Sequence, residues 1–278
     1  MSVGPIARTR HEQSPGFGPC ADVRVLSDTA RRTAGRLSEA DTGILVCMKS
    51  WYPDEQVYAG AEHLDARYVA AYDRKAQFDP TEDIDLLLDA GMDEQSIVVD
   101  LGAGTGAFAV AVSRHCREVV AVDVSAAMVE VLRQRALDGG ATNVRIVQAG
   151  FLTYQHHGDS ADVIFTRNAL HQLPDFWKVV ALQRMTSILR PGGIARVRDL
   201  VFEFDPVATD ERIDAWMEGA VSDPALGFTA GELAAHVRGE FSTYSWLFEQ
   251  MLDKVGLEVV SRSFVRSTYG AYTCTRRT

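Results

Sequence analysis

One strand–turn–helix segment constrains this chain more than any other part of it. Residues 97–99 are apolar and β-branched, as expected for a strand buried on both faces of a sheet. Asp100 follows where this strand ends, and glycine then occupies alternate positions across residues 102–106. Glycine lets the backbone turn tightly and come close to a ligand, because it has no Cβ. With a helix expected from residue 107, the segment predicts a nucleotide-type pocket at the carboxyl edge of a parallel sheet.

A second apolar run, residues 119–122, ends in Asp123, which is spaced to bind ribose hydroxyls. That spacing is shared by dinucleotide-binding domains, and the glycine pattern also fits their motif. A dinucleotide, however, places a pyrophosphate at the helix N-terminus, where an additional negative charge is unfavourable. Asp100 is better suited to the ammonium and sulfonium groups of S-adenosylmethionine. The sequence therefore favours S-adenosyl-L-methionine as cofactor, with an NAD(P)-dependent oxidoreductase as a less favoured alternative.

These motifs resemble those of class I S-adenosylmethionine-dependent methyltransferases of the small-molecule type. The resemblance runs from about residue 68 to the C-terminus. It includes the Asp-x-Gly-x-Gly-x-Gly turn that begins at Asp100, the acidic Asp123, and the Arg-Pro-Gly-Gly turn at residues 190–193. One departure is Gly150, where many members carry an aspartate that binds the adenine amino group. The resemblance implies that a backbone group or Phe151 serves in its place.

The resemblance implies an α/β fold: a doubly wound, Rossmann-like, seven-stranded and mostly parallel sheet with a reversed C-terminal strand and a helical cap. The alternation of apolar strands and helices along the chain predicts a doubly wound parallel sheet independently. The last two strands are joined by a very short link, which requires them to be antiparallel. The expected strands are 96–100, 118–123, 144–148, 161–166, 193–200, 257–265 and 268–275. The expected helices are 62–78, 83–90, 107–115, 125–138, 175–189, 210–221, 229–238 and 242–255.

The sequence divides into an N-terminal segment and a domain that contains one insertion. Residues 1–47 have few large apolar residues and are expected to be a disordered N-terminal extension, with Met48 as the natural start. Residues 48–278 are expected to form the methyltransferase domain. Within it, residues 205–240 interrupt the strand–helix alternation and are expected to form a helical cap over the acceptor.

The cofactor-binding residues are expected at the carboxyl ends of the strands. They are Asp100, Gly102, Gly104, Gly106, Asp123, Val124, Met128, Gly150, Phe151 and Asn168. The first candidate for a general base is His171, just beyond the fourth strand, although a structural role in the turn before Pro174 is an equal alternative. Asp199 is the second candidate base, and Tyr72 is expected to close over the methyl donor. Trp216 is expected either to pack inside the cap or to line the acceptor pocket.

Composition limits the partners. The formal charge of −10 argues against a nucleic-acid substrate, which usually requires a basic face. The four cysteines have no metal-binding spacing, so no metal is expected, and no apolar run is long enough to cross a membrane. We therefore expect a cytoplasmic monomer or homodimer that methylates O, N or C of a small molecule. A non-catalytic S-adenosylmethionine-binding partner or regulatory module is the alternative from a different functional class.

Overall fold

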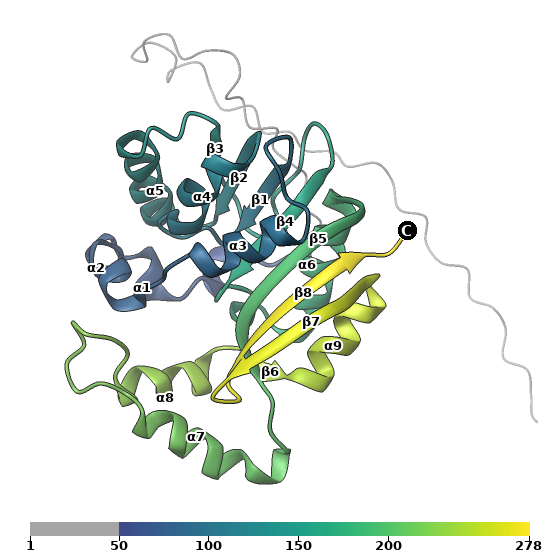
Figure 1. Ribbon diagram of the computed structural model, residues 1–278. Coiled ribbons are helices and arrows are strands. Elements are labelled where there is room, and N and C mark those ends of the chain that lie inside the picture. The colour runs from purple at the N-terminus through teal and green to yellow at the C-terminus, as the bar shows by residue number, and fades with distance from the viewer. Residues whose placement is uncertain (1–49) are drawn as a thin grey trace, which may run out of the picture. The chain divides into compact units, whose positions relative to one another are not determined.

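The apolar runs of the sequence form the strands of one sheet, described by the computed structural model over residues 50–278 (Figure 1). The strands are β1 (Ile97–Leu101), β2 (Glu118–Asp123), β3 (Val144–Gln148), β4 (Ala161–Arg167), β5 (Leu189–Phe202), β6 (Thr243–Tyr244), β7 (Leu257–Val265) and β8 (Tyr269–Arg276). Their order is β3-β2-β1-β4-β5-β8-β7, and the short β6 pairs with the end of β5. β8 is antiparallel to both of its neighbours, whereas β1 to β5 pair in parallel. The predicted mostly parallel sheet with a reversed C-terminal strand is therefore confirmed.

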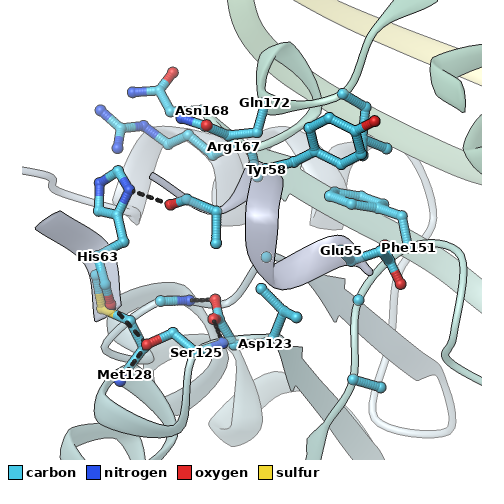
Figure 2. Close-up of a pocket in the computed structure, with 18 of the residues that line it drawn as sticks. Glu55, Tyr58, His63, Asp123, Ser125, Met128, Phe151, Arg167, Asn168 and Gln172 are labelled. Carbon is cyan, nitrogen blue, oxygen red and sulfur yellow. Dashed lines mark hydrogen bonds between the residues drawn. The ribbon is translucent and has the colours of Figure 1, made fainter. Parts of the chain in front are cut away.

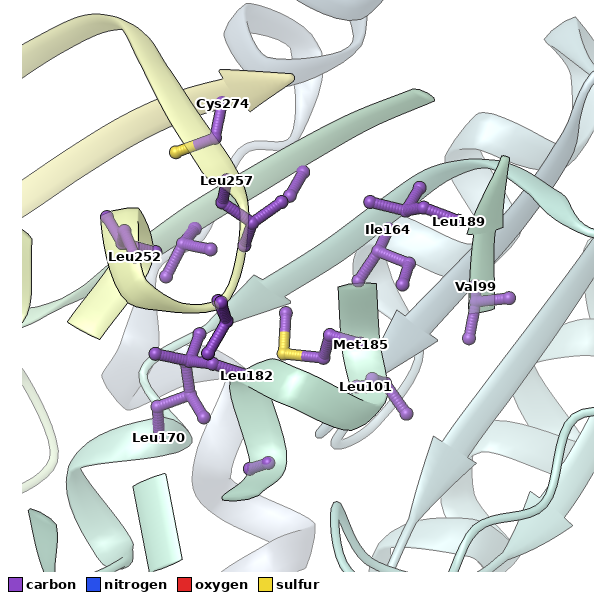
Figure 3. Packing of buried hydrophobic residues seen from close by; sticks show 14 of the residues in the cluster. Val99, Leu101, Ile164, Leu170, Leu182, Met185, Leu189, Leu252, Leu257 and Cys274 are labelled. Atoms are coloured by element: carbon purple, nitrogen blue, oxygen red, sulfur yellow. The ribbon is translucent and has the colours of Figure 1, made fainter. Parts of the chain in front are cut away.

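Helices cover both faces of this sheet, as expected of a doubly wound fold. The helices are η3 (Glu55–Tyr58), α1 (Ala61–Leu64), α2 (Ala66–Ala76), α3 (Thr81–Asp89), α4 (Ala107–Val112), η4 (Ser113–His115), α5 (Ala126–Asp138), η5 (Leu170–Gln172), α6 (Asp175–Ile188), η6 (Pro206–Ala208), α7 (Thr209–Glu218), α8 (Ala230–Gly239) and α9 (Ser245–Lys254). Buried residues of α6 and α9 pack on one face, and buried residues of α3, α4 and α5 pack on the other. Successive residues of β1 point alternately into these two layers, since Val99 belongs to the first and Val98 to the second. Figure 3 shows the first layer, where Leu182 and Met185 of α6 lie beside Ile164.

The register of the strands brings several loops to one edge of the sheet. Leu101 at the end of β1 pairs with Val122 near the end of β2, and Asp100 pairs with Phe165 of β4. In parallel strands the carboxyl ends lie at the same edge, so the loops after β1, β2 and β4 meet there. These loops contain most of the residues that the sequence predicts to bind the cofactor.

Some element boundaries differ from the prediction for local reasons. The expected helix 62–78 is two helices, because Asp65 is extended and its side chain caps α2 by accepting a hydrogen bond of 2.7 Å from the Arg67 N–H. The expected helix 83–90 begins at Thr81, whose N–H donates to the side chain of Asp79. The expected helix 242–255 begins at Ser245, because the two preceding residues form β6.

The segment predicted to be a cap contains α7 and α8. Trp216 of α7 is buried and packs with Leu233 of α8 and Leu200 of β5, a small apolar cluster separate from the two main layers. This contact agrees with the structural alternative for Trp216. An ion pair between Lys75 of α2 and Glu232 of α8 links the segment to the N-terminal helices.

The other predictions on domain organisation stay predictions. Those for residues 1–47 and for Met48 as a start lie outside the described residues. Within residues 50–278, none of the helices combines the length and apolar character needed to cross a membrane.

The buried ion pair between α3 and β5 gives a test of this packing. Asp83 is fully buried and accepts hydrogen bonds of 2.9 Å from Nε of Arg196 and 2.6 Å from Nη1 of Arg198. Asp83→Ala would leave the buried Arg196 guanidinium without its carboxylate, so the free energy of unfolding should fall by about 3–5 kcal/mol. Urea denaturation measures this change. Glu82→Ala, at an exposed neighbouring carboxylate, is the control and should change stability by no more than about 0.5 kcal/mol; equal effects would contradict the assignment.

Candidate functional site

A cavity of about 710 Å³ lies at the edge of the sheet where β1, β2 and β4 end (Figure 2). Predicted residues that line it are Tyr72, Gly102, Gly104, Asp123, Val124, Met128, Gly150, Phe151 and Asn168. The structure therefore brings together most of the predicted cofactor-binding residues in one place.

Asp123 is held by the glycine turn. Its Oδ2 accepts a hydrogen bond of 2.8 Å from the Gly104 N–H, and its Oδ1 accepts one of 2.8 Å from the Ser125 N–H. Burial raises the pKa of the Asp123 carboxyl, and these two N–H donors partly oppose that effect. Each carboxylate oxygen has a second lone pair, so both can still accept a hydroxyl hydrogen from a ligand.

A second cavity, of about 630 Å³, adjoins the first on the other side of the glycine turn. The two share Tyr72, Gly102, Gly104 and Arg167 in their linings. Asp100 lines the second cavity and is buried, and its Oδ2 has no hydrogen-bond partner among the described residues. Burial, and then the charge of Asp123, raise the pKa of the Asp100 carboxyl well above its ordinary value.

Arg167 complements Asp100 in the second cavity. Its guanidinium lies 4.0 Å from the ring centroid of Phe78 and lines both cavities. Within residues 50–278 it forms no ion pair with a carboxylate, so an acidic group and a basic group without ion-pair partners face the same space. An amino-acid zwitterion, with one ammonium and one carboxylate, has the charges that this pair would satisfy.

The N-terminal helices close one side of the first cavity. In Figure 2, His63 and Arg167 lie on one side of the cavity, and Tyr58, Glu55 and Phe151 lie on the other. The Ser125 hydroxyl donates a hydrogen bond of 2.7 Å to the His63 carbonyl, which links α1 to the start of α5.

Glu55 occupies the space beside Gly150. A Cβ on Gly150 would overlap the Glu55 carboxylate, so the side chain fits only because residue 150 is glycine. The carboxylate accepts hydrogen bonds of 2.8 Å from the Leu152 N–H and 2.7 Å from the Thr153 hydroxyl. The space beside Gly150 is therefore occupied by a carboxylate that comes from η3. From the sequence we expect only a backbone group or Phe151 to serve there.

Asn168 is held in a strained backbone conformation at the end of β4. Its φ is 49°, in the left-handed region that residues with a Cβ adopt infrequently, although asparagine tolerates it best. Its N–H donates a hydrogen bond of 2.8 Å to the Arg198 carbonyl, which fixes the loop against β5. The strain places Asn168 in the cavity wall beside Ala169 and Gln172.

Three predicted residues lie outside both cavities. Gly106 has a φ of 82°, and a Cβ there would overlap Leu132, so its visible role is to let α4 begin close to α5. His171 and Asp199 are buried, and Nδ1 of His171 hydrogen-bonds the Asp199 carboxylate. Neither lines a cavity, so they are poorly placed to remove a proton from an acceptor bound there.

Electrostatics also disfavours His171 as a base. Burial alone would lower its pKa, but the neighbouring Asp199 and Glu240 carboxylates outweigh burial and raise the pKa to about 9. A general base must be neutral to accept a proton, whereas this imidazole is mostly protonated at neutral pH. The burial of His171 and its pairing with Asp199 therefore favour the structural alternative, and its role as a general base stays a prediction.

Sequence reasoning missed several cavity residues. Glu55, Tyr58 and His63 come from short helices ahead of the recognised motifs, and nothing in their spacing indicates a ligand. Arg167 and Gln172 flank the predicted Asn168, so the carboxyl end of β4 could have indicated them.

The fold and the two joined cavities define a Rossmann-like nucleoside-binding protein. Comparisons with known proteins agree. A family model described as a methyltransferase domain matches residues 98–193. The uncharacterized methyltransferase YcgJ of Bacillus subtilis is 34% identical over 110 residues, which cover 40% of this chain and 43% of that relative. The alignment thus spans less than half of the relative's length.

Solved structures share the fold. The crystal structure of Bacillus subtilis YcgJ aligns over 71% of this chain and 99% of its own, with 19% identity and a TM-score of 0.53. The N-methyltransferase NodS of Bradyrhizobium japonicum, in complex with S-adenosyl-L-homocysteine, aligns over 71% of this chain and 87% of its own, with 16% identity and a TM-score of 0.50. Residues 98–193 therefore match a methyltransferase domain, and the chain shares the fold of these methyltransferases of known structure.

The position of Asp123 gives a test of ribose binding. Asp123→Ala would remove hydrogen bonds from a charged acceptor, worth about 1.5–3 kcal/mol, so the affinity for S-adenosylhomocysteine should fall about tenfold or more. Isothermal titration measures the affinity, and thermal melting checks the fold. Glu118→Ala, at the opposite end of β2, should leave the affinity unchanged. Unchanged affinity in a folded Asp123→Ala protein would refute the assignment.

Proposed function

We propose that this protein transfers the methyl group of S-adenosylmethionine to a small-molecule acceptor. The observation that carries the proposal is the pair of cavities on either side of the glycine turn. One contains the Asp123 carboxylate with free acceptor capacity, and the other contains Asp100 and Arg167 without ion-pair partners. A nucleoside joined to an amino acid is the ligand whose two halves match these two sets of groups.

Residues of the first cavity would hold the nucleoside. Asp123 accepts hydrogen bonds from the two ribose hydroxyls. Phe151 and Met128 supply apolar contacts for the adenine ring. The Glu55 carboxylate beside Gly150 offers an acceptor for the adenine amino group, since each of its oxygens retains a lone pair.

Residues of the second cavity would hold the amino-acid end. Asp100 accepts hydrogen bonds from the ammonium, whose charge restores the ionised form that burial disfavours. Arg167 binds the carboxylate with a charge-assisted hydrogen bond. Gly102 and Gly104 let the chain between the two halves lie against the backbone; a Cβ on Gly102 would overlap Ala169.

When bound, S-adenosylmethionine supplies an activated methyl group on a sulfonium. The residues around it align the acceptor and exclude water, which together supply much of the rate of such transfers. Tyr72, Arg167 and Asn168 stand where the two cavities meet or beside that junction, so they are the candidates for this task. No residue described in either cavity is a histidine other than His63, whose Nδ1 lies 2.8 Å from the Ala59 carbonyl. This arrangement favours an acceptor that is already nucleophilic and small enough to enter an enclosed site in an acidic protein.

The amino-acid half of the ligand provides the test. Arg167→Gln removes the charge that binds the carboxylate, so the affinity for S-adenosylhomocysteine should fall about tenfold or more. The affinity for 5′-methylthioadenosine, which lacks the amino-acid end, should stay the same. Isothermal titration measures both ligands, with Arg133→Gln on the exposed surface of α5 as the matched control. If the affinities for both ligands fell equally, Arg167 would support the fold and would not bind the carboxylate of the ligand.

The activity itself is tested by incubating the purified full chain with methyl-labelled S-adenosylmethionine and fractions of small molecules. Release of S-adenosylhomocysteine together with a labelled product is the expected result. Binding of NAD in preference to S-adenosylmethionine would overturn the proposal in favour of an oxidoreductase. Tight binding of S-adenosylmethionine without label transfer to any fraction would favour a non-catalytic binding module.

A further inference from the structure

A compact group of metal-binding side chains lies where the cap segment meets the core. It consists of His171 in η5, and His236 and Glu240 at the end of α8. One ligand atom from each lies within 4.8 Å of the others, the only such three-residue group in the described part of the chain. His236 and Glu240 are one helical turn apart, whereas His171 is distant in sequence, so no motif indicates the group. The sequence therefore did not predict a metal site at these residues.

The two imidazole rings are oriented by contacts on their outer sides. Nδ1 of His171 hydrogen-bonds the Asp199 carboxylate, and Nε2 of His236 lies 2.8 Å from the Ser242 hydroxyl. The remaining nitrogens both face Glu240: Nε2 of His171 is 3.0 Å from Oε2, and Nδ1 of His236 is in contact with the same atom. Metal-binding histidines in proteins are held in this way, with the second ring nitrogen bound to a carboxylate or another polar group.

The charges of the cluster can be balanced by protons on the imidazoles or by a bound cation. With neutral imidazoles, Asp199 and Glu240 place two negative charges in a largely buried region, which is unfavourable without compensation. The charge of Lys178 helps to lower the pKa of Asp199, but this lysine pairs with Asp175, donates a hydrogen bond of 2.6 Å to the Phe241 carbonyl and forms no ion pair with Asp199 or Glu240. Oε2 of Glu240 is buried and forms no hydrogen bond of acceptable geometry within residues 50–278. Two protons on the histidines or one divalent ion would balance the charge.

We propose that His171, His236 and Glu240 bind one divalent transition-metal ion of the zinc type. Two imidazole nitrogens and one carboxylate oxygen suit zinc, which takes four ligands at about 2.0–2.2 Å. Ligand atoms around such an ion lie roughly 3.3 Å apart. Oε2 of Glu240 is closer than this to both ring nitrogens, so the carboxylate would move slightly away from the rings when the ion binds between them. Water takes the fourth position, or the side-chain oxygen of Gln172, whose amide lies 3.2 Å from Nε2 of His171.

Such an ion would connect two parts of the chain. His171 follows β4 next to the cavity-lining Gln172, and its carbonyl accepts a hydrogen bond of 2.8 Å from the Phe241 N–H just after α8. Metal binding would therefore hold the end of α8 against the wall of the first cavity. The proposed ion would hold the cap segment in place, and the proposal of a metal site does not depend on the proposed methyl transfer.

The test uses the full-length chain after dialysis against a chelator. Zn²⁺ is titrated with a competing indicator dye, and Co²⁺ serves as a probe because its visible absorption bands report tetrahedral coordination. We expect one equivalent of either ion to bind and the melting temperature to rise on addition of Zn²⁺. Glu240→Gln and His236→Gln, which keep side-chain size and polarity, should each abolish the Co²⁺ bands and the thermal shift.

Two further variants separate a built site from general binding to surface histidines. Ser242→Ala removes the group that orients His236 and should weaken Zn²⁺ affinity about 10–100-fold without abolishing binding. His157→Ala, at an exposed histidine elsewhere, should have no effect. Absence of one-equivalent binding in folded wild-type protein, or full retention of it in Glu240→Gln and His236→Gln, would overturn the proposal.

Discussion

The hydrogen bond from the Gly104 N–H to Asp123 is the interaction on which the site depends. It joins the turn after β1 to the end of β2, and these two loops form the floor between the two cavities. The bond forms because the parallel register brings the ends of both strands to one edge and because glycine lets the turn fold back with a positive φ. A floor fixed in this way can bind a ligand without first ordering its own backbone, so less conformational entropy is lost on binding.

Helices of the segment before β1 complete the walls around this floor, and a helical segment after β5 contacts those helices. η3, α1 and α2 come from the segment before β1, and α7 and α8 come from the segment after β5. Contacts between the two segments are both polar and aromatic: Lys75 pairs with Glu232, its ammonium also lies 5.0 Å from the ring centroid of Phe228, and the rings of Tyr58 and Phe241 meet edge to face. The Lys75 side chain is largely buried in this contact, so the segment after β5 is held to the N-terminal helices by more than an exposed surface pair.

The sequence predicted the sheet, and it predicted that the glycine turn and Asp123 lie together at one edge, because both predictions rest on local patterns. Buried parallel strands are continuous apolar runs, and the glycines and Asp123 follow directly from such runs, so position in sequence determines position in space. Glu55 could not be predicted this way, since only the fold reveals that its carboxylate fills the space left by Gly150. The pairing of His171 with Asp199 and Glu240 was missed for the same reason: each residue lies in a different element, and their charges change one another only once they are buried together. The break between α1 and α2 depends on one hydrogen bond from the side chain of Asp65, which caps α2. The free energy of one cap is only about 1 kcal/mol, so the sequence pattern does not reveal whether the helix continues or stops there.

Asp100 shows that this fold gives up stability to keep a binding group. A buried carboxyl group whose Oδ2 has no hydrogen-bond partner among the described residues makes the ligand-free protein less stable than an apolar residue of the same size would, and the chain nevertheless places it at the end of its central strand. The proposed role of Asp100 in binding an ammonium group would give this unfavourable burial a function. The ligand-free state is accordingly the vulnerable one. In a cell, the abundance of the protein would follow the supply of that ligand, because the bound form resists unfolding and proteolysis better than the free form.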